Sequence, residues 1–184
     1  MDGHTCLRHG KYFKSLVEMY VWVLHFFILW LGPSNAQPPA GKLRVLLFTD
    51  TECPICQKIT PRVQKLADEY QGSVSFELIY PTAQLKESQV KAFQHEYKLS
   101  LPHRLDPKHQ FVRRYKVTTT PEVVLLSATD QVLYQGSIDD QFYKLGSYRT
   151  APQRHYLKEA LEYSLQGKPV PLAYTKAVGC LIND

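Results

Sequence analysis

The chain has 184 residues, of which 44% are hydrophobic and 21% charged, an ordinary composition for a globular protein with one sizeable core. Its formal net charge is +5, but the basic residues form no block and no stripe interleaved with aromatic side chains. We therefore expect one folded domain with extensions, and we do not expect nucleic-acid binding.

Residues 1–36 have the layout of a targeting segment. A weakly basic stretch precedes an apolar run over 21–31, which a Gly-Pro pair ends before small residues up to Ala36. This layout predicts a signal peptide cleaved after Ala36, and hence an exported protein, periplasmic or secreted. The run is short for a spanning helix, which needs roughly 20 residues, although residues 17–31 could form an uncleaved anchor. Cys6 and the three histidines of this segment are assigned no role.

After a linker over residues 37–41, the first expected elements are a buried strand and an amphipathic helix. The strand is indicated over 43–48, where five of six residues are apolar. Spacings of three and four then mark one apolar helix face, and Pro54 suits the first turn. That face consists of Cys56, Ile59, Val63, Leu66, Ala67 and Tyr70. Because the face is uninterrupted, we expect Pro61 to kink this helix rather than end it.

The rest of the domain alternates strand and helix patterns. We expect a strand over 73–80, a helix within 84–97, a helix starting at Asp106-Pro107, a hairpin over 123–136, and a last helix opened by Pro152 and ending before Gly167. This order predicts an α/β domain over residues 42–166, with a central mixed sheet flanked by helices. Residues 167–184 carry two prolines and no helical period, so we expect a C-terminal tail that runs over the surface.

Two cysteines in Cys-x-x-Cys spacing fall where the first strand ends and its helix begins. A helix N-terminus offers unpaired N–H groups and the positive end of the dipole, which favour a thiolate at Cys53. Cys53, at the exposed helix start, is therefore expected to attack, and Cys56 to resolve the mixed disulfide. A static disulfide and half of a zinc site are the alternatives. Zinc needs about four ligands, and the chain has no second Cys-x-x-Cys and no His-x-His pair, so no metal site is assigned.

Several of these features resemble thioredoxin. The family has a strand, a Cys-x-x-Cys and a helix with a proline five residues after the second cysteine, where this chain has Pro61. Thr120-Pro121 before an apolar run resembles the cis-proline loop that faces the dithiol. The resemblance covers about residues 42–166 and implies a thioredoxin-like fold. It also implies a cis peptide after Thr120, whose backbone would pair with an extended substrate.

The finer detail is closer to the secreted redoxin-domain branch of thiol-disulfide oxidoreductases. The matching segments are Thr51-Glu52-Cys53-Pro54, Thr120-Pro121-Glu122-Val123, the run 134–140 and a late Gly179-Cys180. The resemblance implies exchange with protein or small-molecule thiols and disulfides, and an upstream redox partner that resets the pair. No cofactor is implied, because the dithiol carries the electrons.

Two positions depart from thioredoxin. The tryptophan that usually precedes the first cysteine is Glu52, and the buried acid of the preceding strand falls on Leu47. A carboxylate beside Cys53 opposes thiolate formation. Proton transfer from Cys56 would need another base, for which Asp50 and Glu52 are the candidates.

Two rival functions share this fold. A copper- or haem-assembly metallochaperone would use the cysteine pair with a distant histidine, but the domain's histidines show no ligand spacing with one another. A peroxidase-type redoxin would need proline and threonine seven and three residues before the cysteine, where this chain has Leu46 and Asp50.

Cys180 lies in the tail, within a run of apolar and small residues over 177–182. If the leader is removed, three cysteines remain, an odd number. One interpretation is that the run covers an apolar patch, with Cys180 a buried small side chain. The other starts from redoxin relatives with a late Gly-Cys and no second active-site cysteine. By that resemblance, Cys180 would lie near Cys53 as a third redox thiol.

Overall fold

The computed structural model describes residues 42–183. The predicted signal peptide, the alternative anchor over 17–31 and the linker over 37–41 lie outside the described residues. Within residues 42–183, no helix combines the length and the apolar character that a membrane span requires.

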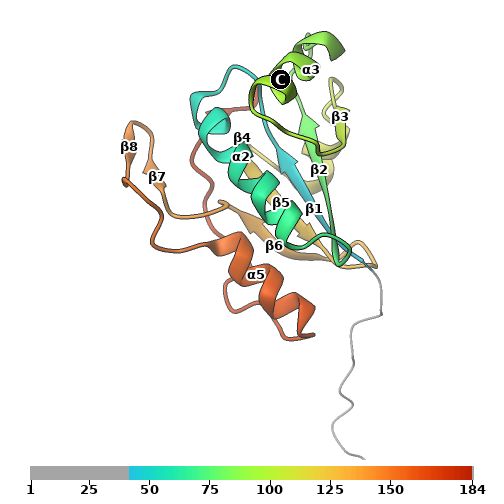
Figure 1. Cartoon of the computed structure of the whole chain (residues 1–184), viewed down its shortest axis with the longest axis vertical. Coiled ribbons are helices and arrows are strands. Elements are labelled where there is room, and N and C mark those ends of the chain that lie inside the picture. The colour runs from blue at the N-terminus through green and yellow to red at the C-terminus, as the bar shows by residue number, and fades with distance from the viewer. Residues whose placement is uncertain (1–41, 184) are drawn as a thin grey trace, which may run out of the picture. The chain divides into compact units, whose positions relative to one another are not determined.

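A five-stranded mixed sheet in the order β3-β2-β1-β5-β6 forms the centre of the fold (Figure 1). Its strands are β1 (Leu43–Phe48), β2 (Val74–Tyr80), β3 (His103–Leu105), β5 (Glu122–Leu126) and β6 (Val132–Gly136). The first three run parallel, β5 runs antiparallel to β1, and β6 closes the predicted hairpin. The sequence prediction of an α/β protein with a mixed sheet is confirmed.

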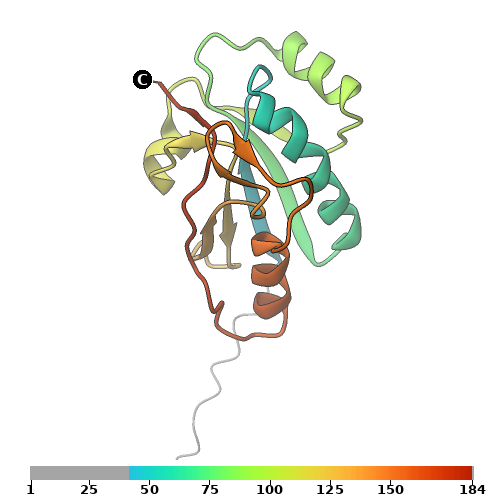
Figure 2. The ribbon, with the colours of Figure 1, turned by 90° about the vertical axis from the view of Figure 1, so that its left-hand side faces the viewer.

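Two short strand pairs lie outside this sheet. One joins β7 (Phe142–Lys144) to β8 (Ser147–Tyr148), and the other joins β4 (Thr119–Thr120) to β9 (Cys180–Leu181). Figure 2 shows the segment after the last helix running back along the molecule to the C-terminus. The tail is therefore part of the packed structure, and its last strand pairs beside the loop that holds Pro121.

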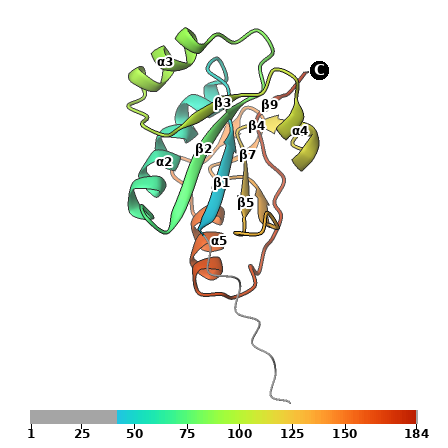
Figure 3. The ribbon, with the colours of Figure 1, turned by 90° about the vertical axis from the view of Figure 1, so that its right-hand side faces the viewer.

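Helices cover both faces of the sheet (Figure 3). They are α2 (Pro54–Glu69), α3 (Glu87–Glu96), α4 (Gln110–Tyr115) and α5 (Tyr156–Leu165). Apolar side chains of α2, α3 and α5 share one core cluster with Val45 and Leu47 of β1. Those of α4 share a second cluster with Leu46 and Phe48. Alternate residues of β1 thus enter opposite cores, which explains its nearly continuous apolar sequence.

Helix α2 runs continuously through Pro61, as the uninterrupted apolar face predicts. Cys56, Ile59 and Val63 are among its buried residues. Pro54 occupies the first turn and needs no hydrogen-bond acceptor there, since it has no N–H.

Helix α4 begins at Gln110, so the predicted start at Asp106-Pro107 is wrong by three residues. His109, just before the helix, has a φ of 51° and therefore cannot continue a right-handed turn. The Asp106 carboxylate nevertheless accepts the N–H groups of Gln110 at 2.7 Å and Phe111 at 2.9 Å. It caps the helix from outside the first turn.

Helix α5 begins at Tyr156 rather than at Pro152, which is a second correction. The segment before the helix is tied to Asp140, whose carboxylate accepts the N–H groups of Gln153 at 2.7 Å and Arg154 at 3.0 Å. The Arg154 carbonyl in turn accepts the Asp140 N–H at 3.1 Å. These bonds to a distant loop hold the segment in a non-helical path.

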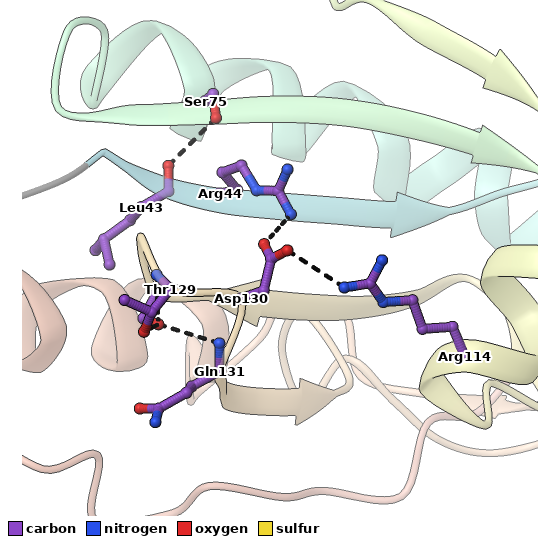
Figure 4. A network of polar contacts seen from close by, with 8 residues as sticks. Leu43, Arg44, Ser75, Arg114, Thr129, Asp130 and Gln131 are labelled. Atoms are coloured by element: carbon purple, nitrogen blue, oxygen red, sulfur yellow. Dashed lines mark hydrogen bonds and ion pairs between the residues drawn. The ribbon is translucent and has the colours of Figure 1, made fainter.

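A polar network fixes the turn between β5 and β6 (Figure 4). Asp130 has a φ of 61° and pairs with Arg44 of β1 at 2.5 Å and Arg114 of α4 at 3.2 Å. The Ser127 hydroxyl accepts the N–H of Gln131 at 3.1 Å. The charged side chains of the two ion pairs are about half exposed, so each pair contributes at most about 1 kcal/mol. The network lies at the start of β1, whereas Cys53 follows its end.

Candidate active site

The two cysteines occupy the junction between β1 and α2, with Cys53 capping the helix and Cys56 one turn inside it. Cys56 is fully buried, and Cys53 is only 3% exposed. The expectation of an exposed helix start at Cys53 is therefore wrong. The physical reason is that the loop before Pro121 and the C-terminal strand border this position, which the sequence around Cys53 does not reveal.

Hydrogen bonds lower the pKa of Cys53 to about 5, against an ordinary value of 9.0. The Cys56 thiol makes the largest contribution, and burial of Cys53 acts in the opposite direction. The Cys180 thiol and the backbone N–H groups of Cys56 and Cys180 lower the pKa further. A Cys53 thiolate thus receives donors from the helix start on one side and from the tail on the other.

The pKa of Cys56 is raised well above its ordinary value, first by burial, then by its hydrogen bond to Cys53 and by the negative charge of the Cys53 thiolate. A hydrogen bond from the Thr49 hydroxyl and one from the Asp50 backbone oppose this rise. At neutral pH the two thiols therefore differ in state, because Cys53 is ionised while Cys56 keeps its proton.

The Thr120–Pro121 peptide bond is cis, and the Thr120 carbonyl lies 3.4 Å from the Cys53 sulfur, where it accepts the thiol proton when Cys53 is not ionised. Glu122, directly after the proline, is buried. Its carboxylate accepts a hydrogen bond from the Gln135 amide at 2.7 Å and contacts the backbone N–H of Thr118 at 3.4 Å. Neutral donors thus hold a buried carboxylate under the loop that faces the dithiol.

The tail occupies the other edge of this loop. Cys180 pairs with Thr120 and Leu181 with Thr119 in an antiparallel ladder, and the Ile182 N–H donates to the Thr118 carbonyl at 3.1 Å. The resemblance assigned the Thr120 backbone to a substrate strand, and here the chain's own C-terminus pairs with it. Cys180 is exposed, so its interpretation as a buried small side chain is wrong.

A cleft of about 310 Å³ opens beside Cys53. It is lined by Asp50, Glu52, Cys53, Pro81, Thr82, Ala83, Thr120, Cys180, Leu181, Ile182 and Asn183. Four residues predicted from the sequence, Asp50, Glu52, Cys53 and Thr120, thus line one opening together with Cys180, while the fully buried Cys56 lies behind Cys53 in α2. Pro121 is next to this lining in the chain.

The two candidate bases differ in how they are held. The Asp50 carboxylate accepts the Glu52 N–H at 2.8 Å and also accepts the Thr82 hydroxyl. Its charge raises the pKa of Cys180, after burial and Cys53, so it lies within electrostatic reach of that thiol. Glu52 is exposed at the rim.

Tyr80 and Thr49 are site residues that the sequence interpretation missed. Tyr80 ends β2, is fully buried, and its hydroxyl makes no hydrogen bond within residues 42–183. Its pKa is raised by burial, then by the negative charge that Cys56 carries once ionised and by the charge of Asp50. The signal was present in the topology, because parallel strands end at the same sheet edge, and Tyr80 and Thr49 both lie at those ends.

Within residues 42–183, no group of three or more His, Cys, Asp or Glu side chains could hold a metal ion. His103 contacts Glu87 at 2.9 Å, and the buried His109 contacts the Pro81 carbonyl at 2.9 Å. The metallochaperone alternative therefore finds no support in the described residues.

The sheet order and the helices on both faces define the class of thioredoxin-fold proteins. A family model described as thioredoxin-like matches residues 41–132, half of the chain, and the chain belongs to this family.

Among curated proteins, the chain is 33% identical over 76 residues to the thioredoxin-like protein YneN of Bacillus subtilis, covering 41% of this chain and 45% of that protein. It is 28% identical over 103 residues to the thiol-disulfide oxidoreductase ResA of Halalkalibacterium halodurans, covering 55% and 58%. The chain spans about half the length of the curated relatives it matches.

Among solved structures, an uncharacterized conserved protein of Geobacillus kaustophilus has a TM-score of 0.68 at 22% identity, covering 78% of this chain and 77% of that one. At this identity the likeness supports the fold.

The lowered pKa of Cys53 predicts the pH profile of its alkylation. Since only the thiolate reacts, the rate with iodoacetamide should be flat from pH 6 to 9 and should fall tenfold per pH unit below about 5. For an ordinary cysteine, with a pKa of 9.0, the rate falls below about pH 9. Cys180 is an internal control. Partial burial of its sulfur and the neighbouring Cys53 thiolate raise its pKa to about 12, so it should react slowly over this range. Rates read by mass mapping that rise for Cys53 between pH 6 and 8 would contradict the assignment.

Proposed function

We propose that the chain is an extracytoplasmic thiol-disulfide oxidoreductase that exchanges disulfides with protein or small-molecule thiols through Cys53 and Cys56. The observation that carries the proposal is the placement of two free thiols one helical turn apart at the start of α2, beside the Thr120 carbonyl. This placement separates the acidities of the two thiols. Cys53 has a pKa of about 5, while the pKa of Cys56 lies well above the ordinary value of 9.0. Extracytoplasmic location rests on the signal-peptide pattern of residues 1–36.

Reduction of a substrate disulfide would begin with the Cys53 thiolate. It attacks one sulfur, the substrate S–S bond breaks, and one substrate thiolate leaves. Cys56 then loses its proton and attacks Cys53, which forms the Cys53–Cys56 disulfide and releases the second substrate thiolate. The substrate gains two electrons, the dithiol loses two, and an upstream partner restores the dithiol.

Neutralisation of the Cys53 charge in the mixed disulfide removes one cause of the raised pKa of Cys56. The second step is thus triggered by the first. We assign the proton acceptor to Asp50 or Glu52, the two carboxylates of the cleft. Thr120 and Pro121 are proposed to hold the partner chain beside Cys53.

The direct test is exchange with glutathione disulfide by the full reduced chain. We expect two glutathione molecules released per chain and a Cys53–Cys56 disulfide on peptide mapping. A reduced chain that releases none, with both thiols still alkylatable, would overturn the proposed function.

The acidity of Cys53 also sets an expected reduction potential. With a pKa of about 5, its thiolate at pH 7 stabilises the reduced form about 50-fold more than a thiol with the thioredoxin pKa of about 7. Tenfold corresponds to about 30 mV for a two-electron couple, so the potential should lie about 50 mV above the thioredoxin value of about −270 mV, near −220 mV. Redox titration in glutathione buffers measures it. A value below about −270 mV would contradict acidity at Cys53 as the controlling feature.

A further inference from the structure

The C-terminal strand lies against the candidate dithiol as a substrate strand would. Antiparallel pairing places Cys180 opposite Thr120, the residue before the cis peptide bond. The Thr120 carbonyl is also the acceptor for the Cys53 thiol at 3.4 Å. Thr120 therefore contacts both Cys53, at the start of α2, and Cys180, in β9.

The position of this strand is fixed by its own sequence. At Gly179 an added Cβ would lie 2.0 Å from the Thr120 carbonyl oxygen, so only glycine allows the two backbones to approach this closely. The strand brings Cys180 to the site because the residue before it has no side chain.

The tail is also anchored upstream of the site. The Thr175 N–H donates to the Gln135 carbonyl at 3.0 Å, and the Gln135 N–H donates to the Ala173 carbonyl at 2.9 Å. The Thr175 hydroxyl lies 2.6 Å from the Tyr134 hydroxyl and accepts the Ser137 N–H at 2.9 Å. Residues 173–182 are thus held at two places, on β6 and on β4.

The Cys180 side chain reaches the reacting atoms. Cys180 pairs with Thr120, whose carbonyl lies 3.4 Å from the Cys53 sulfur, and the Cys180 thiol and backbone N–H are close enough to Cys53 to lower its pKa. It is exposed, lines the cleft beside Cys53, and lies on the open side of that sulfur, whereas Cys56 lies on the buried side. A disulfide partner that enters the cleft and reacts at Cys53 would meet Cys180 at once.

We infer that Cys180 is a third redox thiol of this site, which the C-terminal strand presents to Cys53 as a built-in substrate. The inference rests on the proposed function. In a mixed disulfide Cys53 carries no charge, so one cause of the raised pKa of Cys180 is gone. Cys180 gives its proton to the Asp50 carboxylate of the cleft, and the Cys180 thiolate attacks the Cys53 sulfur, so that the bond to the partner breaks and the partner leaves as a thiolate. Cys56 then loses its proton and attacks the Cys53–Cys180 disulfide at Cys53, which forms Cys53–Cys56 and releases Cys180 as a thiolate that takes up a proton. The second step exchanges one disulfide for another, so it needs no further oxidant.

The arrangement also bears on substrate class. A small disulfide can enter the cleft with the strand in place, but an extended polypeptide must displace β9 to pair with Thr120. The tail and a polypeptide substrate therefore compete for β4.

The test uses full chains in a Cys6→Ser background, so that every disulfide maps to the folded domain. Cys56→Ser protein is treated with one equivalent of glutathione disulfide. We expect glutathione to join Cys53 and then to leave, with a Cys53–Cys180 disulfide on peptide mapping. The control Cys56→Ser/Cys180→Ser should keep glutathione on Cys53.

A matched variant keeps the Cys180 thiol but displaces the strand that holds it beside Cys53. In Cys56→Ser/Gly179→Ala, the methyl group clashes with the Thr120 carbonyl, and release of glutathione should slow at least tenfold. Lys168→Ala, a substitution at an exposed position earlier in the tail, should leave the release rate unchanged. Circular dichroism confirms that each variant is folded.

The outcomes separate the two proposals. If Cys56→Ser keeps glutathione on Cys53 while Cys180 remains alkylatable, the role of Cys180 is overturned and the proposed function stands. An unchanged release rate in the Gly179→Ala variant would overturn the placement of Cys180 by the strand. If Cys53 takes up no glutathione in any chain, including the wild type, the proposed function fails and this inference fails with it.

Discussion

Replacing Cys53 by serine is expected to abolish disulfide exchange, with a loss of more than about 1000-fold in turnover. A serine hydroxyl is not ionised at neutral pH, and the donors that lower the pKa of Cys53 cannot make it a comparable nucleophile. Release of glutathione from glutathione disulfide measures the loss. Full activity in Cys53→Ser protein would show that the attacking sulfur is another one.

Replacing both candidate resolving thiols, Cys56 and Cys180, should trap the mixed disulfide at Cys53, whereas Cys53→Ser prevents this intermediate from forming. In Cys56→Ser/Cys180→Ser protein the first attack remains and neither second attack can follow, so mixed disulfides at Cys53 should accumulate. Non-reducing electrophoresis followed by mass mapping detects them. Cys180→Ser alone is the control and should accumulate no mixed disulfide, since Cys56 still resolves it. A double variant that accumulates no mixed disulfide would contradict the assigned order of attack.

The position of the dithiol was predictable because its determinants are local. The apolar run of β1, the spacing of apolar residues in α2 and Pro54 at the first turn all lie within 27 residues, Leu43 to Glu69. Each is a pattern of backbone period or of capping, which the sequence displays directly. The same reasoning predicted that α2 continues through Pro61.

The surroundings of the dithiol come from distant parts of the chain. Thr120 is 67 residues from Cys53 in the chain. Its carbonyl is the acceptor for the Cys53 thiol, and its backbone pairs with Cys180. Burial of Cys53 follows from this long-range packing, so a pattern read around residue 53 could not predict it. Pairing of Cys180 with Thr120 was likewise invisible, although the resemblance to redoxin relatives raised the possibility of a nearby thiol.

The run from Tyr134 to Asp140 was noted in the sequence only as a resemblance, and the structure gives its polar members separate tasks. The buried Tyr134 hydroxyl donates to the Ser137 carbonyl at 2.5 Å. The buried Asp139 carboxylate pairs with Arg62 of α2 at 3.0 Å. Together with Asp140, which holds the start of α5, they join both helices to the end of β6.

The helix starts were the least predictable feature, and Asp106 shows why. An Asp-Pro pair usually marks the cap and the first residue of a helix. Here the carboxylate reaches over residues 107–109 to the N–H groups of the next turn, which depends on the left-handed backbone of His109. Sequence identifies the capping group correctly but not the loop that it spans.

Asp106→Ala should therefore be among the most destabilising polar substitutions in the domain. Asp106 is 4% exposed, and besides Gln110 and Phe111 its carboxylate accepts the N–H of the buried Val112 at 3.1 Å. Alanine leaves that donor without an acceptor where water cannot replace it. The expected cost is about 2–3 kcal/mol in the free energy of unfolding, or a Tm lowered by about 5–10 °C.

Urea and thermal unfolding of the variants measure this cost. Asp68→Ala is the matched control, because Asp68 is exposed near the end of α2 and its carboxylate bonds only the Gln64 side chain among residues 42–183. Its effect should stay within about 0.5 kcal/mol. Asp106→Asn should fall between the two, since its amide keeps one oxygen acceptor. Loosening of α4 in Asp106→Ala should also affect the candidate active site. Helix α4 leads through Val117 directly into β4, which carries the Thr120 carbonyl that faces Cys53. If Asp106→Ala were as stable as Asp68→Ala, the carboxylate would not be what holds α4 and this approach to the dithiol in place.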